Sequence, residues 1–188
     1  MSVVHTHHWS KKTQIALEYA YKCQDNGLDV FWLNCSTPQS LFAAFNHIQR
    51  MIQAVKKNDY DDDRTAVHQW LKHHKNWLLI FDNADDSSFP YGDWIPRYNG
   101  NASTRRILFT TRDERLSGAM INSVKAEVPL MDDHEATDLF NAGTAGISEK
   151  STRSYESVLG LVQRLANLPL AVALAAACLR EYPWVTVE

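Results

Sequence analysis

The 188-residue sequence has no excess of basic residues and no long hydrophobic run. Its 19 Lys and Arg residues are outnumbered by 22 Asp and Glu residues, which excludes the basic surface that binds nucleic acid non-specifically. The longest apolar stretch, residues 168–179, is too short to span a bilayer. We therefore expect neither a nucleic-acid partner nor a membrane attachment.

Cysteine is also scarce. The three cysteines are widely separated and form no CxxC pair, which excludes both a disulfide framework and a cysteine-based zinc site. The His5–Thr6–His7–His8 segment has no Cys, Asp or Glu nearby to complete a set of metal ligands. Because the N-terminus does not read as a secretory signal, we expect a reducing, cytoplasmic protein.

The hydrophobic pattern predicts strands that alternate with helices. Buried strands are predicted over residues 29–34, 77–82, 106–112 and 124–130, with a short first strand at 2–4. Helical spacing is found over residues 12–24, 41–55 and 67–74, and Thr37-Pro38 has the form of a helix start. Residues 87–103 contain the prolines and glycines of a loop.

From Asp132 onward the pattern is helical throughout. Residues 132–135 resemble a capping box, a stripe of apolar residues begins at Tyr155, and Pro169 opens an alanine-rich helix. The sequence therefore predicts a parallel α/β domain over residues 1–130, with a truncated first strand, and a partial helical subdomain over 131–188.

Polar residues follow two neighbouring predicted strands. Five apolar residues run from Trp77 into Asp82, and the next strand ends at Thr110, Thr111 and Arg112. The carboxyl ends of parallel strands are where such sheets bind ligands. Nucleotide sites of the P-loop kind place there an aspartate that serves Mg²⁺ and a polar or cationic group near the terminal phosphate.

Five segments in order along the chain, 12–20, 31–34, 79–86, 107–112 and 165–171, resemble the NB-ARC domain of STAND-class NTPases. These domains are the ADP/ATP switch modules of NOD-like receptors in innate immune signalling. Segment 79–86 matches the Walker B motif in a form most like fungal members, and segment 165–171 matches the "GLPLA" motif. The resemblance implies a P-loop NTPase-like parallel sheet flanked by helices, followed by part of a helical ARC subdomain.

The resemblance also implies roles for individual residues. Lys12 would contact the phosphates of ADP or ATP, and Thr13 and Asp82 would hold Mg²⁺. Arg112 would approach the phosphates as a sensor, and Pro169 would pack near the adenine and ribose. Other NB-ARC chains would be the partners in an oligomer.

The chain departs from the family pattern at the glycine loop that should wrap the phosphates. Thr6 and Lys11 occupy the places of its two required glycines, and His8 and Trp9 stand where glycine is usual. A non-glycine residue forced to φ > 0 costs about 1–3 kcal/mol, so two or three such positions would abolish micromolar binding.

Two further departures concern Asn83 and Asn167. Asn83 replaces the second acidic residue of the Walker B segment, and an amide cannot act as a base. Asp85 and Asp86 are the remaining candidates for a catalytic carboxylate. Asn167 stands where the GLPLA motif usually has glycine. With the glycine loop and second carboxylate missing, we do not expect efficient ATP hydrolysis.

The leading hypothesis is therefore an NB-ARC switch module with impaired or lost nucleotide binding. Two alternatives stay open. One is a competent ADP-binding domain whose N-terminus is misassigned, because the match to the family begins abruptly at Lys12. The other is a non-enzymatic scaffold that pairs with other NB-ARC proteins.

Overall fold

The computed structural model describes residues 2–5, 11–53, 62–97, 104–116, 124–145 and 154–182. The predicted end of the second helix at Val55 and the loop positions Thr6, His8 and Trp9 lie outside these ranges. The chain forms two compact units, which meet in the sequence at Val128 and Pro129.

The first unit is built on a five-stranded parallel sheet in the order β2-β3-β4-β1-β5. The strands are β1 (Ser2–His5), β2 (Asp29–Asn34), β3 (Trp77–Asp82), β4 (Arg105–Thr111) and β5 (Val124–Glu127). Asn34 on β2 is opposite Asp82 on β3, and Phe81 on β3 is opposite Phe109 on β4. This register aligns the carboxyl ends of β2, β3 and β4, and the parallel α/β architecture predicted from the sequence is confirmed.

The last strand is shorter than predicted. The sequence pattern extends it to Leu130, but β5 ends at Glu127. Pro129 has no backbone N–H to donate to a strand ladder, which accounts for the early end.

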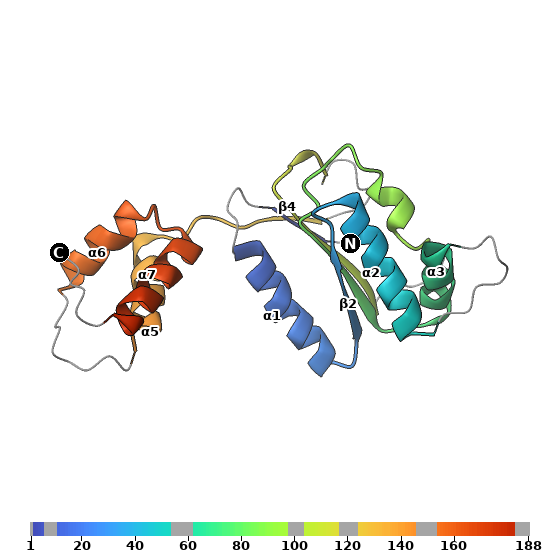
Figure 1. Ribbon diagram of the computed structural model, residues 1–188, viewed down its shortest axis with the longest axis horizontal. Helices are drawn as coiled ribbons and strands as arrows, with labels where there is room; N and C mark the ends of the chain where they lie inside the picture. Colours follow the sequence, from blue (N-terminus) through green and yellow to red (C-terminus); the bar gives the residue numbers. More distant parts are fainter. Residues whose placement is uncertain are drawn as a thin grey trace. The chain divides into compact units, whose positions relative to one another are not determined.

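The strand β3 is buried on both faces because helices cover both sides of the sheet (Figure 1). One face packs against α1 (Lys11–Asp25), and the other packs against α2 (Pro38–Met51) and α3 (Asp63–His73). Alternate β3 side chains serve the two cores, with Leu78 and Ile80 facing α1, and Leu79 and Phe81 facing α2 and α3. All six residues of the strand are buried, as its continuous apolar run predicts.

Local signals set the start of α2 as predicted. The Thr37 hydroxyl accepts a hydrogen bond from the Ser40 amide, the Ser40 hydroxyl accepts one from the Thr37 amide, and Pro38 is the first helical residue. These contacts satisfy donors that a helix N-terminus otherwise leaves unpaired.

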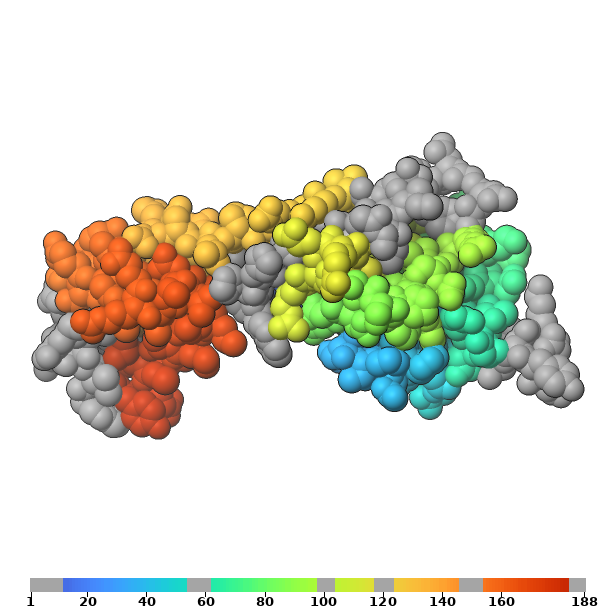
Figure 2. Space-filling model, turned by 90° about the horizontal axis from the view of Figure 1, so that it is seen from above, coloured from blue at the N-terminus to red at the C-terminus, as the bar shows by residue number. Residues whose placement is uncertain are grey.

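The predicted loop 87–103 contains a short 3₁₀ helix, η1 (Tyr91–Trp94). Trp94 is 5% exposed, and its ring lies 5.0 Å from the ring of Phe45 on α2. Its carbonyl oxygen accepts a hydrogen bond of 3.0 Å from His68 Nε2, so that α3 lies beside this segment (Figure 2). The packing of Trp94 thus stabilises a 3₁₀ helix in a segment whose composition predicts only a loop.

The second unit consists of α5 (Asp133–Gly143), α6 (Tyr155–Arg164) and α7 (Pro169–Glu181). The capping box predicted before α5 is present, with reciprocal hydrogen bonds between Asp132 and Glu135. Its core is formed by buried side chains from all three helices, including Phe140, Val162 and Ala176. None of the helices in the described ranges is long and apolar enough to cross a membrane.

Two glycines of this unit provide a matched stability test. A Cβ added at Gly143 would lie 2.7 Å from the Ala176 Cβ, whereas a Cβ at Gly160 would meet no atom within 4 Å. We expect Gly143→Ala to destabilise the unit by about 1–2 kcal/mol, because overpacking exceeds the gain in helix propensity. Gly160→Ala should instead stabilise it by up to about 1 kcal/mol.

Hydrogen–deuterium exchange of the α5 and α7 amides in the whole chain measures both effects. Faster exchange is expected in Gly143→Ala and equal or slower exchange in Gly160→Ala. Slower exchange in both variants would show that α5 and α7 do not approach as closely as the structure indicates.

Candidate functional site

Asp82 is the central carboxylate of the candidate site in the first unit. As the last residue of β3 it is 7% exposed. Its Oδ1 accepts hydrogen bonds from the hydroxyl of Thr13 on α1, at 3.1 Å, and from the hydroxyl of Thr110 on β4, at 2.6 Å. The fold thus brings together Thr13 and Asp82, the two residues predicted to hold Mg²⁺.

The chain turns sharply after Asp82 because Asn83 adopts a left-handed conformation with φ of +60°. Asparagine tolerates this region better than most non-glycine residues. The Asn83 amide donates to the Thr110 hydroxyl at 3.0 Å, and the Ala84 amide donates to the Thr110 carbonyl at 2.9 Å. Thr110 therefore fixes both Asp82 and the turn that follows it, rather than standing free to contact a ligand.

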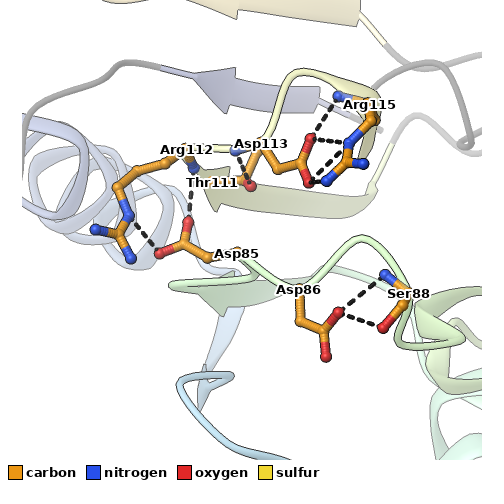
Figure 3. A network of polar contacts seen from close by, with 7 residues as sticks. All are labelled: Asp85, Asp86, Ser88, Thr111, Arg112, Asp113 and Arg115. Carbon is orange, nitrogen blue, oxygen red and sulfur yellow. Dashed lines mark hydrogen bonds and ion pairs between the residues drawn. The ribbon is translucent and has the colours of Figure 1, made fainter.

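This turn directs Asp85 toward Arg112, the residue directly after β4 (Figure 3). The Arg112 backbone amide donates to Asp85 Oδ1 at 2.6 Å, and its Nε donates to Oδ2 at 2.7 Å. One carboxylate thus binds both the main chain and the side chain of the predicted phosphate sensor.

Lys12 lies in the first turn of α1 and is 3% exposed. Burial lowers the pKa of its ammonium group below the usual value, and the charge of Arg112 lowers it further. The carboxylates of Asp85 and Asp82 act in the opposite direction. Lys12, Arg112, Asp82 and Asp85 therefore form one electrostatically coupled group.

The other acidic side chains near this edge have different partners (Figure 3). Asp86 Oδ1 accepts hydrogen bonds from the Ser88 hydroxyl and amide, which lower the pKa of Asp86. Asp113 pairs with Arg115, Oδ2 accepting from a terminal guanidinium nitrogen at 2.7 Å, and this contact holds the pKa of Asp113 well below its usual range. The candidate catalytic carboxylates, Asp85 and Asp86, are thus both engaged within the protein.

Pro169 is the first residue of α7 and belongs to the second unit. Asn167, which stands where glycine is usual in the GLPLA motif, has a φ of +51°. Its side-chain nitrogen donates to Asp133 Oδ1 at 2.7 Å. The backbone conformation explains the family preference for glycine at this position, and the contact with Asp133 helps to hold asparagine there.

Among the described residues of the first unit, Thr13 and Asp82 are of the kind that can hold a magnesium ion. Thr13 and Asp82 supply adjacent oxygen donors, and Mg²⁺ commonly takes one or two protein ligands while keeping several waters. The described residues contain no group of three or more His, Cys, Asp or Glu side chains suited to a different metal site. Lys12 and Arg112 lie at the same edge, but Asp85 already partners the arginine.

Sequence reasoning placed Asp82, Thr13 and Arg112 as candidates but missed the pairing of Arg112 with Asp85. These residues are separated by 27 positions in the chain. The sequence feature that could have indicated this ion pair is an acidic residue shortly after β3 together with a basic residue directly after the neighbouring strand β4. Recognising it requires knowing that β3 and β4 are adjacent.

Comparison with known proteins gives a consistent assignment. The family model described as "NB-ARC domain" matches residues 12–148. A nucleotide-binding leucine-rich repeat (NLR)-like protein of the fungus Hyaloscypha variabilis is 30% identical over 187 residues, covering 90% of this chain and 19% of that protein. A probable disease resistance protein of Arabidopsis thaliana is 25% identical over 126 residues, covering 67% of this chain and 12% of its own length. The chain thus spans about a fifth or less of the curated relatives it matches.

Among solved structures, Cdc6p from Pyrobaculum aerophilum superposes with a TM-score of 0.65 at 10% sequence identity. The match covers 97% of this chain and 56% of that one. At this identity the likeness concerns the fold alone.

Proposed function

The chain belongs to the NB-ARC domain family, and from this premise we propose that it is a nucleotide-switch module whose affinity for ADP and ATP is impaired. The assignment to the nucleotide-binding modules of NLR-like proteins rests on the match over residues 12–148. The impairment is our proposal, and the observation that carries it is the missing glycine at positions 6 and 11 of the phosphate loop.

The charge balance at the site supports this proposal. Lys12 and Arg112 are the cations that would meet the phosphates, and the carboxylates of Asp82 and Asp85 lie beside them. A bound phosphate would need to compete with Asp85 for Arg112 and would have no glycine loop to surround it. Mg²⁺, if bound, would supply positive charge to the phosphate oxygens, and Thr13 and Asp82 would hold it.

We also propose that the module does not hydrolyse ATP at an appreciable rate. Asn83 has no carboxylate, Asp85 is bound to Arg112, and Asp86 is bound to Ser88. We infer that none of the three acts as an efficient general base toward a water molecule. Such a module would then contribute to an NB-ARC oligomer through its folded structure rather than through ATP hydrolysis.

Titration calorimetry with Mg-ADP tests the proposed impairment on the 188-residue chain. We expect a dissociation constant weaker than about 1 µM, equivalent to a binding free energy weaker than about 8 kcal/mol. A thermal melt should accordingly show little increase in midpoint with micromolar Mg-ADP, since stabilisation grows with the ratio of free ligand to dissociation constant. Tight binding would contradict the proposal and show that residues 6–11 bind phosphate without the usual glycines.

A further inference from the structure

The contact between Asp85 and Arg112 differs from an ordinary surface ion pair. Asp85 follows β3 and Arg112 follows β4, so the contact joins the ends of two central strands. Both Asp85 oxygens are used by the same arginine, one by its amide and one by its Nε. The Asp85 side chain is 24% exposed and the Arg112 side chain 43% exposed, so the contact is only partly screened by solvent.

The nearby pair of Asp113 and Arg115 shows what a local ion pair looks like in the same region (Figure 3). Its two residues are two positions apart, and the Arg115 side chain is 81% exposed. Asp113 does not figure among the charges that act on Lys12, whereas Asp85 is the carboxylate with the largest effect on it. Asp85 therefore acts on both cations of the candidate phosphate site, and Asp113 provides a matched comparison.

A carboxylate and a phosphate oxygen make the same kind of charged, directional hydrogen bond with a guanidinium group. The two anions therefore compete wherever a phosphate must reach an arginine that a carboxylate already binds. The two cations of the candidate phosphate site, Lys12 and Arg112, are matched in number by the carboxylates of Asp82 and Asp85 without any ligand.

We propose that Asp85 is an internal anion that occupies the phosphate-contacting arginine, and that it selects against phosphate at this site. The proposal rests on the nucleotide-site assignment made above, and it identifies Asp85 as a residue acting through Arg112. Binding of an anion with two or more phosphates requires Arg112 to exchange the Asp85 carboxylate for a phosphate oxygen. Asp85 thereby raises the concentration of phosphate at which the site becomes half occupied.

The test measures binding of pyrophosphate, which has phosphates but no adenine or ribose, to the whole chain at constant ionic strength. Asp85→Asn removes the charge and keeps an oxygen that can accept from the Arg112 amide. We expect it to bind pyrophosphate about tenfold more tightly than the unmodified chain, the scale of one charge-assisted hydrogen bond. Asp113→Asn, which releases Arg115 and changes net charge equally, should alter the affinity less than twofold.

Three further substitutions complete the test. In the presence of Arg112→Gln, the Asp85→Asn change should lose most of its tenfold effect, because the residue through which it acts has been removed. Asp85→Ser is a second charge-removing variant with the same expected gain, for use if Asp85→Asn does not fold in a thermal melt. Asp85→Glu keeps the charge and should leave the pyrophosphate affinity within about threefold.

An equal gain in Asp85→Asn and Asp113→Asn would overturn the proposal, and so would the absence of any gain, including no detectable binding in every protein. These outcomes are separate from failure of the proposed function. The absolute affinity of the unmodified chain for Mg-ADP decides whether nucleotide binding is impaired, whereas the ratio of pyrophosphate affinities decides the role of Asp85.

Discussion

Glycine at positions 6, 8, 9 and 11 is expected to increase the affinity for Mg-ADP about a hundredfold. The four substitutions, Thr6→Gly, His8→Gly, Trp9→Gly and Lys11→Gly, restore a loop next to Lys12 and Thr13, which are already present. A strained position costs about 1–3 kcal/mol, so relief at only two of the four positions, at about 1.4 kcal/mol each, corresponds to about a hundredfold in binding.

Alanine at the same four positions is the matched control. Alanine removes the bulk of histidine and tryptophan as glycine does, but it does not relieve the penalty of a positive φ. We expect its gain in affinity to be no more than about tenfold, measured by titration calorimetry with Mg-ADP. Equal affinities for the glycine and alanine proteins would show that side-chain bulk alone prevents binding. Unchanged affinity in the glycine protein would show that the obstacle lies elsewhere at the site.

Trp77→Ala is expected to cost about 3–5 kcal/mol of folding free energy, the largest stability effect that we predict. The Trp77 side chain is fully buried at the start of β3, and its Nε1 donates a hydrogen bond of 3.0 Å to the Leu71 carbonyl near the end of α3. Its removal leaves a large cavity and an unpaired helix carbonyl. Domains of this size are stable by only about 5–15 kcal/mol, so the loss is a large share of the total.

Urea unfolding followed by circular dichroism measures this loss, and Trp77→Phe separates its two causes. Phenylalanine fills much of the indole volume but cannot donate to Leu71, so we expect a smaller cost of about 1–3 kcal/mol. A cost in Trp77→Phe equal to that in Trp77→Ala would assign the effect to the hydrogen bond rather than to the cavity. A negligible cost in both would mean that the first unit does not depend on the packing between α3 and β3.

Local sequence patterns were sufficient to predict most elements of the fold. The strand at 77–82 can be predicted from its continuous apolar run alone, because a strand covered by helices on both faces has no polar side. The starts of α2 and α5 depend on hydrogen bonds between residues three positions apart, at Thr37 with Ser40 and at Asp132 with Glu135. Contacts of this range are visible in the sequence.

Local sequence patterns did not predict the features that depend on contacts between residues far apart in the chain. The 3₁₀ helix at Tyr91–Trp94 sits in a segment rich in turn residues, and its position depends on the packing of Trp94 against α2 and α3. The left-handed conformations of Asn83 and Asn167 are likewise consistent with their residue type but are not required by it. The surrounding chain selects them.

The sequence by itself determined the family, the order of strands and helices, and the absence of glycine from the phosphate loop, because each is a property of consecutive residues. It also placed Thr13, Asp82 and Arg112 at element ends. Only the tertiary structure decided that Thr13 and Thr110 share one oxygen of Asp82, and that Asp85 binds Arg112. These contacts exist because β3 and β4 lie side by side and the first turn of α1 lies at their carboxyl ends. Sheet order is set by long-range packing rather than by local sequence.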